Sequence, residues 1–555
     1  MSQIDLPFIG SIITDAQNTI NTVVKEGERI VKEGTDAVQE GGRLLKEGAE
    51  RVVDEGAHMI RQGGLGALNA FSPVSKRVQV YSWVAKDNYS VEFSVPGKKI
   101  RKNQRYSWSN DDLEVDSRSL QDTFDGQFIF RVYNGNGAEV FSRTNTINAA
   151  TGFIQSGNMT SLDEMQPQLV NNGEAVVAFG FYDAGPGWAG LPRAHQCWVT
   201  VTPNWAGWMA SVAPLGSEQA KKPFNTFVLP GGHDCGMNSM ETFGNIWSHV
   251  HDAHDVVSKI AGPLNLPSQI TGVLAEVAPY VISGLSRTQT AGITSSMLLG
   301  ARYFEFRPAE MSTFFDFAPR DGELYYQHML IPGISFMRFL AEVISFLRQN
   351  QGEIAVLQIR YDGVHETCVR PSHEVVGHWI ERGLKEWGGD VIKTGNKDDM
   401  KNSVAWLRNK QKRLIVLQDI GQYSSYLEDE YKTFDGSNIV KVFEGFLKNA
   451  STSLKGNDLA VWQCQATSTL KWAADLASIL KPSSLALTSP LLATKARCDT
   501  QTLPWLLNNV FPTMRATVLQ AIINDFLDGA TVDVAIALSQ KYFDDKTVGP
   551  ATDPQ

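Results

Sequence analysis

Apolar and polar residues alternate along the first part of the chain, between residues 76 and 212. The alternation has a period of two in segments such as RVQVYSWVAK, YSVEFSVPG, QFIFRVY and EAVVAFGFYD. Turn residues separate these segments, and NGNG after QFIFRVY is typical of a hairpin connection. The pattern predicts an antiparallel β-sandwich over residues 71–215.

From Pro223 onward, buried-type apolar runs alternate with helical patterns, which is the order that a βα barrel requires. Strand candidates begin near Thr226, Tyr303, Leu324, Ile354, Leu414, Leu459 and Ala521. We therefore expect a (βα) TIM-type barrel over residues 216–555.

A heptad repeat of the form VVKEGER, IVKEGTD, AVQEGGR and LLKEGAE lies between residues 15 and 62. Seven-residue spacing keeps the aliphatic pairs on one stripe, so residues 1–70 are predicted to form an amphipathic helical segment. The recurring glycines cost roughly 1 kcal/mol each against alanine, so this helix needs a partner. Docking along the catalytic domain is favoured because the polar face is acid-rich; self-association and bilayer binding stay open.

The whole chain is thus expected to be a multidomain α+β protein. Its formal net charge of −10 argues against broad nucleic-acid binding. Five widely spaced cysteines without a CxxC pair are expected to be reduced and mostly structural. A signal peptide and a transmembrane helix are not expected, so the cytoplasm is the default location; release by a route without a signal peptide stays open.

The segment FVLPGGHDCGMNS is the first candidate for chemistry. Two glycines let the backbone turn sharply where an apolar run stops, and His233 and Asp234 follow them. An imidazole exchanges protons near neutral pH, and a carboxylate orients the ring or stabilises its charge.

Two further apolar runs carry matching groups. LGARYFEFRPAEM ends in Arg307, with Glu305 two residues earlier and so on the same face, and LYYQHML carries His328. Two histidines, an arginine and carboxylates suit cleavage of a phosphodiester by a general base and a general acid, with the guanidinium neutralising charge on the phosphoryl oxygens.

These residues resemble the catalytic X domain of phosphatidylinositol-specific phospholipase C, in particular its bacterial-type, metal-independent branch. LPGGHDCG, GARYFEFRP and QHML resemble the first three motifs of that family. SFLRQNQGEIAVLQIRY, KRLIVLQ, LAVWQCQAT and AIINDFLDGATVDVAIAL follow in the expected order. The resemblance covers roughly residues 220–545.

The resemblance implies a role for each matching residue. His233 would be the general base that takes the proton of the inositol 2-hydroxyl, and Asp525 would orient it. His328, coupled to Asp234, would be the general acid for the diacylglycerol oxygen. Arg307 would hold the phosphate in the space that calcium fills in eukaryotic relatives, so the resemblance implies no metal and no cofactor. Arg360 and Glu305 are weaker candidates for substrate binding.

Several features depart from the family. Gly232 stands where Thr or Ser is usual, and Cys235 stands where Ser is common. The interval from Met240 to Leu298 is unusually long, is predicted to carry helices and is a candidate lid. Trp188, Trp205 and Trp208 form either an aromatic binding rim or part of the core, and the core is favoured.

The expected substrate is a phosphoinositide or a related lipid headgroup at a membrane surface. One alternative is a metal-dependent glycerophosphodiester or sphingomyelin phosphodiesterase on the same barrel. The other is a membrane- or glycan-binding, toxin-like protein in which the barrel is inactive.

Overall fold

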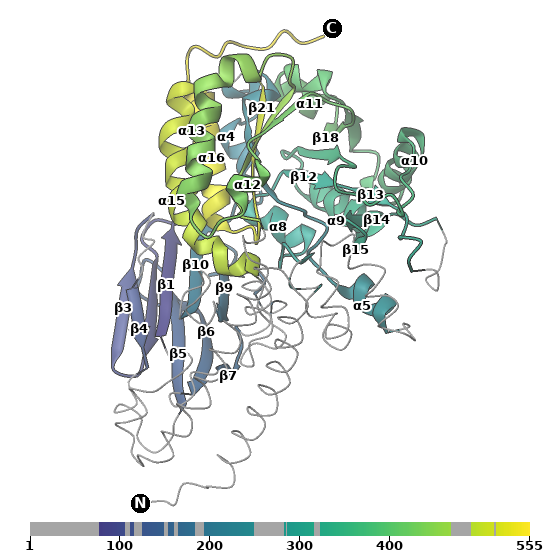
Figure 1. Ribbon diagram of the computed structural model, residues 1–555. Coiled ribbons are helices and arrows are strands. Elements are labelled where there is room, and N and C mark those ends of the chain that lie inside the picture. Colours follow the sequence, from purple (N-terminus) through teal and green to yellow (C-terminus); the bar gives the residue numbers. More distant parts are fainter. Residues whose placement is uncertain are drawn as a thin grey trace, which may run out of the picture.

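In the computed structural model of the protein, two N-terminal sheets lie beside a larger, curled sheet that helices cover (Figure 1). The structure describes residues 77–105, 111–115, 125–148, 154–159, 162, 165–183, 194–248, 282, 284, 286–315, 322–467, 490–514 and 518–554. The heptad repeat and Trp188 lie outside the described residues.

The N-terminal strands form two five-stranded sheets with the orders β4-β1-β10-β9-β8 and β3-β2-β5-β6-β7. The strands of the first sheet are β1 (Arg77–Val84), β4 (Asp111–Glu114), β8 (Gln168–Val170), β9 (Ala175–Asp183) and β10 (His195–Pro203). Those of the second are β2 (Ser90–Val95), β3 (Lys98–Lys102), β5 (Asp125–Tyr133), β6 (Glu139–Asn148) and β7 (Ile154–Gly157). One pair departs from the antiparallel pattern that the sequence predicts, because β1 and β10 run parallel.

Aromatic rings pack between these two sheets. Phe128 on β5 stacks on Phe181 of β9 with ring centroids 5.4 Å apart, and Phe130 lies 5.3 Å from Phe179. Every second residue of β5 is buried, as the period of two predicts. The predicted hairpin is confirmed: β5 and β6 are adjacent, and the Gly137 amide closes the turn onto the Asn134 carbonyl at 2.9 Å.

The second half of the chain builds an eight-stranded sheet in which every paired strand is parallel, in the order β17-β18-β16-β12-β11-β21-β20-β19. Its strands are β11 (Val228–Gly232), β12 (Tyr303–Phe306), β16 (Ala355–Ile359), β17 (Lys393–Gly395), β18 (Lys412–Leu417), β19 (Gln422–Ser424), β20 (Leu459–Gln463) and β21 (Leu519–Asn524). The sheet curls into a half-barrel (Figure 1), and within the described ranges no pairing joins its edge strands β17 and β19. A closed TIM-type barrel stays a prediction.

The strand predicted near Leu324 is real, but its expected place in the parallel sheet was wrong. It is β14 (Tyr325–His328), the middle strand of a small antiparallel sheet with β13 (Pro308–Ala309) and β15 (Ile331–Ser335). A tight turn connects β14 to β15, and so short a connection allows only antiparallel pairing, because parallel neighbours need a long crossover. His328 therefore approaches the parallel sheet from an excursion that follows β12.

Helices follow most of the parallel strands. The α-helices are α4 (Trp208–Val212), α5 (Glu241–Trp247), α8 (Ile293–Leu299), α9 (Phe336–Gln349), α10 (His373–Gly383), α11 (Val404–Asn409), α12 (Glu428–Tyr431), α13 (Gly436–Ser453), α15 (Pro490–Thr513) and α16 (Gly529–Asp544). Short turns of other types are η3 (Gln219–Lys221), η4 (Phe224–Thr226), η6 (Leu384–Gly388) and η7 (Asp398–Lys401). No helix in the described part of the chain is both long and apolar enough to span a membrane.

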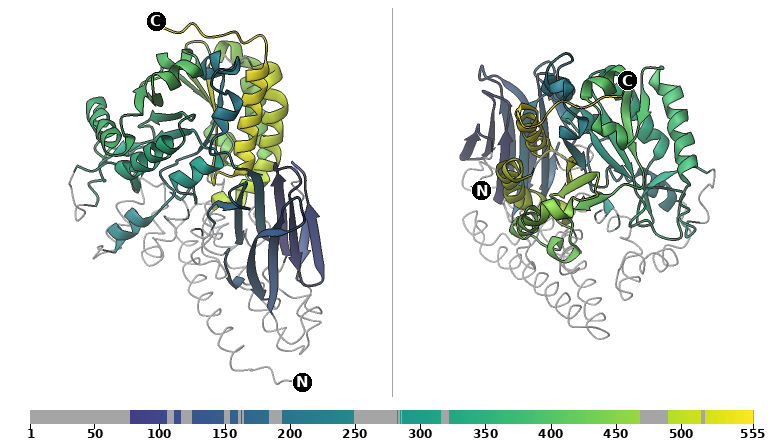
Figure 2. Two further views of the ribbon diagram at one scale, coloured as in Figure 1. Left: turned by 180° about the vertical axis from the view of Figure 1, so that it is seen from behind. Right: turned by 90° about the horizontal axis from the view of Figure 1, so that it is seen from above.

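Helix α16 joins the two halves of the molecule, because it contacts β11 of the parallel sheet and β10 of the N-terminal strands. Seen from above, the yellow C-terminal helices lie between the purple-blue strands and the green part of the fold (Figure 2). Trp83 of β1 donates a hydrogen bond from Nε1 to Asp533 Oδ2 at 3.0 Å. One continuous cluster of buried apolar residues runs through both halves.

Two predictions about single residues are decided by burial. Trp208 is 1% exposed and donates from Nε1 to the Gly300 carbonyl at 2.8 Å, so the binding-rim interpretation is wrong for this residue. Trp205 is only partly buried and packs against the same core. All five cysteines are buried and unpaired, which confirms the expectation that they form no disulfide.

Candidate active site

Three neighbouring strands of the parallel sheet, β12, β11 and β21, deliver predicted site residues at one edge. Gly232 is paired with Asn524 of β21 and with Phe304 of β12. His233, Arg307 and Asp525 come directly after these strands, and the carboxyl ends of parallel strands meet at a single edge of the sheet. The topology alone therefore brings residues from three distant parts of the chain together.

The His233 ring is oriented by Asp525. The two groups are 2.8 Å apart, from Nδ1 to Oδ1. An ionised carboxylate only accepts hydrogen bonds, so Nδ1 carries the proton and Nε2 is directed to the other side of the ring. On that side Nε2 lies 3.6 Å from Asp234 Oδ1.

Asp234 is the centre of the cluster. Its carboxylate lies 2.7 Å from Arg307 Nη2 and accepts a hydrogen bond of 2.5 Å from the Tyr326 hydroxyl. His328 approaches the other oxygen, with Nε2 3.5 Å from Oδ2. Both imidazoles therefore face one carboxylate that also holds a guanidinium.

Glu305 and Arg360 form a second, adjoining pair. Glu305 accepts a hydrogen bond from the backbone amide of Asp234 at 3.1 Å, and its other oxygen binds Arg360 Nη1 at 2.5 Å. The far side of the Arg360 guanidinium is bound by Asp362. Arg360 is thus held by two carboxylates next to the cluster, and Glu305 links it to the His-Asp turn.

Burial and charge shift the titration of these groups in opposite directions. Burial alone would lower the pKa of His233, but Asp234 and Asp525 outweigh it and raise that pKa to about 9. For His328 burial dominates and lowers the pKa, against the attraction of Asp234. Burial would raise the pKa of Asp234, but Arg307 and the histidines hold it well below its usual range. Two imidazoles with separated pKa values beside one anion-binding group are typical of acid-base catalysis.

Solvent reaches the reactive side chains, which a substrate requires. The exposed fraction is 16% for the His233 side chain, 11% for Arg307 and 26% for His328. Arg307 Nε and His328 Nδ1 are buried and have no hydrogen-bond partner among the described residues. Unpaired buried polar atoms of this kind are costly and are uncommon away from functional sites.

The turns that present the site are strained. Asp234, Met329 and Phe526 directly follow site residues or belong to them, and each has a positive φ, of 46°, 58° and 48°. Residues with a side chain rarely adopt this conformation, and it persists only where surrounding contacts enforce it. The strain lies where the chain presents its candidate chemistry.

Three residues at the site are absent from the sequence-based set. Tyr326 lies two positions before His328 on β14. Because side chains alternate between the two faces of a strand, the sequence places both residues on one face and could have identified Tyr326. Thr288 and Gln289 lie in the long interval before α8, where no motif marks them. Both donate hydrogen bonds to backbone carbonyls of the His-Asp turn.

The ligand atoms of His233, Asp234 and Glu305 lie within 4.8 Å of one another, a spacing that can hold a metal ion. Both carboxylates already bind a guanidinium, Asp234 that of Arg307 and Glu305 that of Arg360. A cation at this point would have to compete with two arginines.

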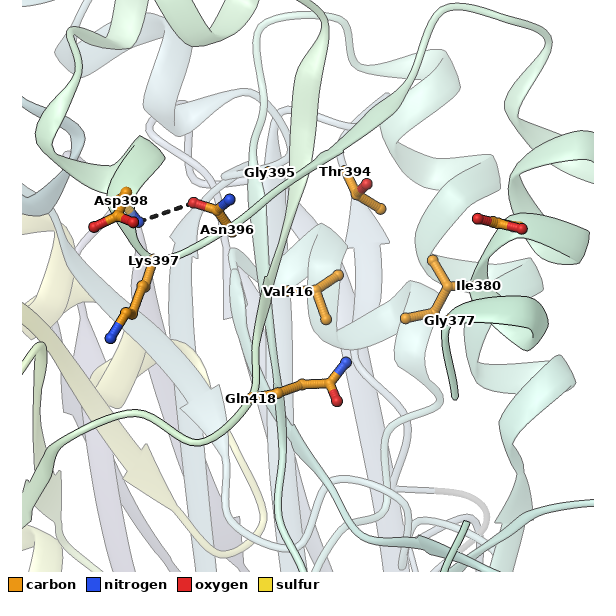
Figure 3. A pocket seen from close by; sticks show the side chains of 10 residues that line it. Gly377, Ile380, Thr394, Gly395, Asn396, Lys397, Asp398, Val416 and Gln418 are labelled. Carbon is orange, nitrogen blue, oxygen red and sulfur yellow. Dashed lines mark hydrogen bonds between the residues drawn. The ribbon is translucent and has the colours of Figure 1, made fainter. Parts of the chain in front are cut away.

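A separate cavity of about 460 Å³ lies outside the parallel sheet, between α10, β17, η7 and β18. Val416 and Gln418 of the β18 region lie opposite Ile380 of α10 (Figure 3). None of the predicted site residues lines this cavity.

Comparison with solved structures finds the phosphatidylinositol-specific phospholipase C of Staphylococcus aureus. A structure from work on its membrane binding is 14% identical, covers 61% of this chain and 97% of its own, and has a TM-score of 0.36. A single-site mutant of that enzyme is 13% identical, covers 60% and 96%, and has a TM-score of 0.35. No family model and no curated protein matches the chain. At this identity and TM-score the similarity carries no weight in assigning a function.

Proposed function

We propose that the protein is a phosphodiesterase that cleaves a phosphoinositide or a related lipid headgroup in the manner of a phospholipase C. The observation that supports this most directly is the single carboxylate of Asp234, which faces two imidazoles and holds a guanidinium. A phosphodiester needs a base, an acid and a fixed positive charge around one phosphorus atom, and this cluster supplies all three.

In the proposed reaction His233 Nε2 takes the proton of a hydroxyl adjacent to the phosphate on the headgroup. That oxygen forms a new bond to phosphorus, and the bond from phosphorus to the diacylglycerol oxygen breaks. The leaving oxygen receives a proton from His328. The products are a cyclic phosphate and diacylglycerol, because a neighbouring hydroxyl is held next to phosphorus while water must first be captured.

Asp525 and Asp234 orient the two imidazoles in this proposal. Asp525 accepts the Nδ1 proton of His233 and so leaves Nε2 free for the substrate. Asp234 supports the protonated form of His328 and fixes Arg307, whose side chain is 11% exposed and would hold a phosphoryl oxygen. Glu305 and Arg360 are not assigned a contact with the substrate, because they already bind each other. Their proposed role is to hold the neighbouring catalytic residues in place.

The proposed reaction uses Arg307 in place of a metal ion, and no cofactor. The guanidinium is delocalised, permanently charged and suited to two phosphoryl oxygens at once. The specific alternative is a metal-dependent phosphodiesterase, which the spacing of His233, Asp234 and Glu305 would allow. The same proposal divides the chain into three domains with boundaries at residues 70 and 215. It also places the reaction at a membrane surface.

Release of water-soluble phosphate from phosphatidylinositol vesicles tests this function. We expect the full chain to release inositol cyclic phosphate, detected by ³¹P NMR, at equal rates with EDTA and with added Ca²⁺ or Mg²⁺. His233→Ala and His328→Ala should each lower the rate by a factor of about 10² to 10⁴. Activity that EDTA abolishes would favour the metal-dependent alternative. A chain that releases no headgroup but binds vesicles would favour a binding protein with an inactive barrel.

A further inference from the structure

A short segment of the long interval between β11 and β12 is buried against the candidate active site. Residues 286–290, which we call the strap, are all between 2% and 7% exposed, although residues 287–290 form neither helix nor strand. The strap reaches the two strand ends that carry the His233-Asp525 pair. Buried backbone without regular structure needs specific partners, so its hydrogen bonds are informative.

Gln289 makes three hydrogen bonds with its side-chain amide. Nε2 donates to the His233 carbonyl at 2.8 Å and to the Asn524 carbonyl at 2.9 Å, and Oε1 accepts from the Leu527 amide at 2.9 Å. His233 follows β11, whereas Asn524 and Leu527 lie on either side of Asp525. One side chain therefore joins the backbones of the histidine and of the carboxylate that orients it.

Thr288, the neighbouring residue of the strap, forms hydrogen bonds at the positions where the backbone of the site has a positive φ. Thr288 Oγ1 donates to the Asp234 carbonyl at 3.0 Å, and the Phe526 amide donates to the Thr288 carbonyl at 2.7 Å. Asp234 and Phe526 are two residues of the site with positive φ. The strap thus bonds to both turns at the positions where the backbone is strained.

Gly232 gives an independent reason to associate Gln289 with the site. A Cβ at this position would lie 2.9 Å from Cδ, 3.0 Å from Nε2 and 3.1 Å from Oε1 of Gln289. A buried amide with three hydrogen bonds cannot easily move aside. The Gln289 amide therefore fills the space that a serine or threonine side chain would need, which explains the glycine immediately before His233.

We propose that Gln289 is a positioning residue that sets the geometry of the His233-Asp525 pair, an inference that rests on the proposed function. The bond between Nδ1 and Oδ1 depends on the relative placement of two turns on separate strands. The Gln289 amide bonds to both turns and to no reacting atom. Without it, the turns are joined by the backbone bond from the His233 amide to the Asn524 carbonyl at 2.9 Å and by the two bonds of Thr288, none of which holds Leu527.

Gln289→Ala and Gln289→Glu test the proposal, the second because a carboxylate keeps the size but cannot donate to two carbonyls. In both we expect kcat on phosphatidylinositol to fall between about tenfold and 100-fold with KM little changed, because misplacement of a catalytic group mainly affects the chemical step. In Gln289→Ala the pKa of His233, followed by NMR of ¹³C-labelled histidine, should move down from its raised value as contact with Asp525 weakens. Gln349→Ala, at the exposed end of α9, is the matched control and should behave like the parent.

Gly232→Ser supplies a second, independent measurement. Alone it should lower kcat, because the new side chain displaces the amide; combined with Gln289→Ala it should cost less than the two single losses multiplied together. The proposal would be overturned if the loss of kcat in the double variant equalled the product of the two single losses. A Gln289→Ala variant with parental kcat and parental His233 pKa would overturn it as well. If both Gln289 variants fail to fold, Gln289 is a structural residue and the proposal is wrong. The NMR comparison decides the positioning role even if the parent releases no headgroup.

Discussion

Arg307 Nη2 lies 2.7 Å from Asp234 Oδ1, so the guanidinium from the end of β12 and the carboxylate after β11 form one buried ion pair. The pair brings a permanent positive charge to the carboxylate that two imidazoles, widely separated in the sequence, both approach. A buried ion pair is weak evidence for stability, because desolvation offsets most of the attraction. Its position beside two titratable rings with opposite pKa shifts gives it a functional interpretation.

Replacement of Arg307 by lysine should disable the reaction while it keeps the positive charge. Lysine presents a point charge and cannot bind Asp234 and a phosphoryl oxygen in the same planar arrangement. We expect kcat to fall by a factor of about 10² to 10³, as when one transition-state donor is removed. Steady-state kinetics of Arg307→Lys, with the exposed Arg338→Lys as control, measures this. A lysine variant with parental kcat would show that Arg307 does not bind the phosphate.

The pH dependence of kcat/KM should be bell-shaped. Because the proposed base has the higher pKa, the pair carries one proton near neutral pH, mostly on His233, and the reactive form is the fraction with that proton on His328. The acidic limb should lie below pH 6.5, where His328 takes up a second proton because burial lowers its pKa from that value, and the alkaline limb near pH 9, where the pair loses its last proton. Asp525→Asn removes a negative charge beside His233, which lowers its pKa, so the alkaline limb should move to lower pH. The exposed Asp398→Asn is the control. An alkaline limb unaffected by Asp525→Asn would contradict the pairing of these two residues.

Tyr326→Phe should weaken both the site and the fold. Its hydroxyl bonds the ionised Asp234 in a fully buried position, and hydrogen bonds to charged groups contribute about 1.5–3 kcal/mol. We expect a loss of that order in the free energy of unfolding, measured in urea, and a lower kcat. Tyr325→Phe is the matched control, because Tyr325 is only half-buried and its hydroxyl bonds Glu323 at 3.1 Å. Equal effects of the two changes would argue against a special role of Tyr326.

A buried charged cluster behind the site should control stability. Lys495 Nζ lies 2.5 Å from Asp499 Oδ2 and 3.2 Å from Asp528 Oδ2, and all three side chains are at most 1% exposed. Lys495→Met leaves two buried carboxylates without a counter-charge, and loss of one partner in such a cluster costs about 3–5 kcal/mol. Urea unfolding should show this loss, whereas Lys432→Met at the surface should leave the midpoint unchanged. An unchanged midpoint for Lys495→Met would mean that the cluster adds nothing to stability.

The alternation of apolar residues predicts the long N-terminal strands β1, β2, β5, β6, β9 and β10. Alternate burial holds for β5, whereas β10 is buried at successive positions and so on both faces. The alternation does not reveal β3, whose sequence KKIRK has no apolar alternation and which forms an edge strand covered by lysines and arginines. Charged edge strands are common because they prevent pairing with other chains. The parallel pair of β1 and β10 was also unpredictable, since strand direction depends on contacts between residues more than a hundred positions apart.

The order of the motifs along the sequence predicts which residues carry the proposed chemistry, but it does not predict which residues hold them in position. His233, Asp234, Arg307 and Asp525 come together because strand ends meet at one edge, which the βα pattern implies, and His328 joins them from β14 of the small antiparallel sheet. The sequence placed His328 on a strand of the parallel sheet, which was wrong. A short apolar run has the same pattern in a barrel strand and in a hairpin strand, so the pattern cannot distinguish them. Gln289 could not be found from sequence, since an amide in an irregular segment acquires its role only from the two turns that it touches.

The most direct test of the central claim compares two leaving groups on inositol phosphodiesters. An alkyl alcohol needs a proton from His328 as it departs, whereas nitrophenolate leaves without one. We expect His328→Ala to lose a factor of about 10² to 10⁴ on the alkyl ester and little on the nitrophenyl ester, while His233→Ala loses activity on both. Equal losses of His328→Ala on the two esters would contradict the assignment of acid and base across one phosphorus atom.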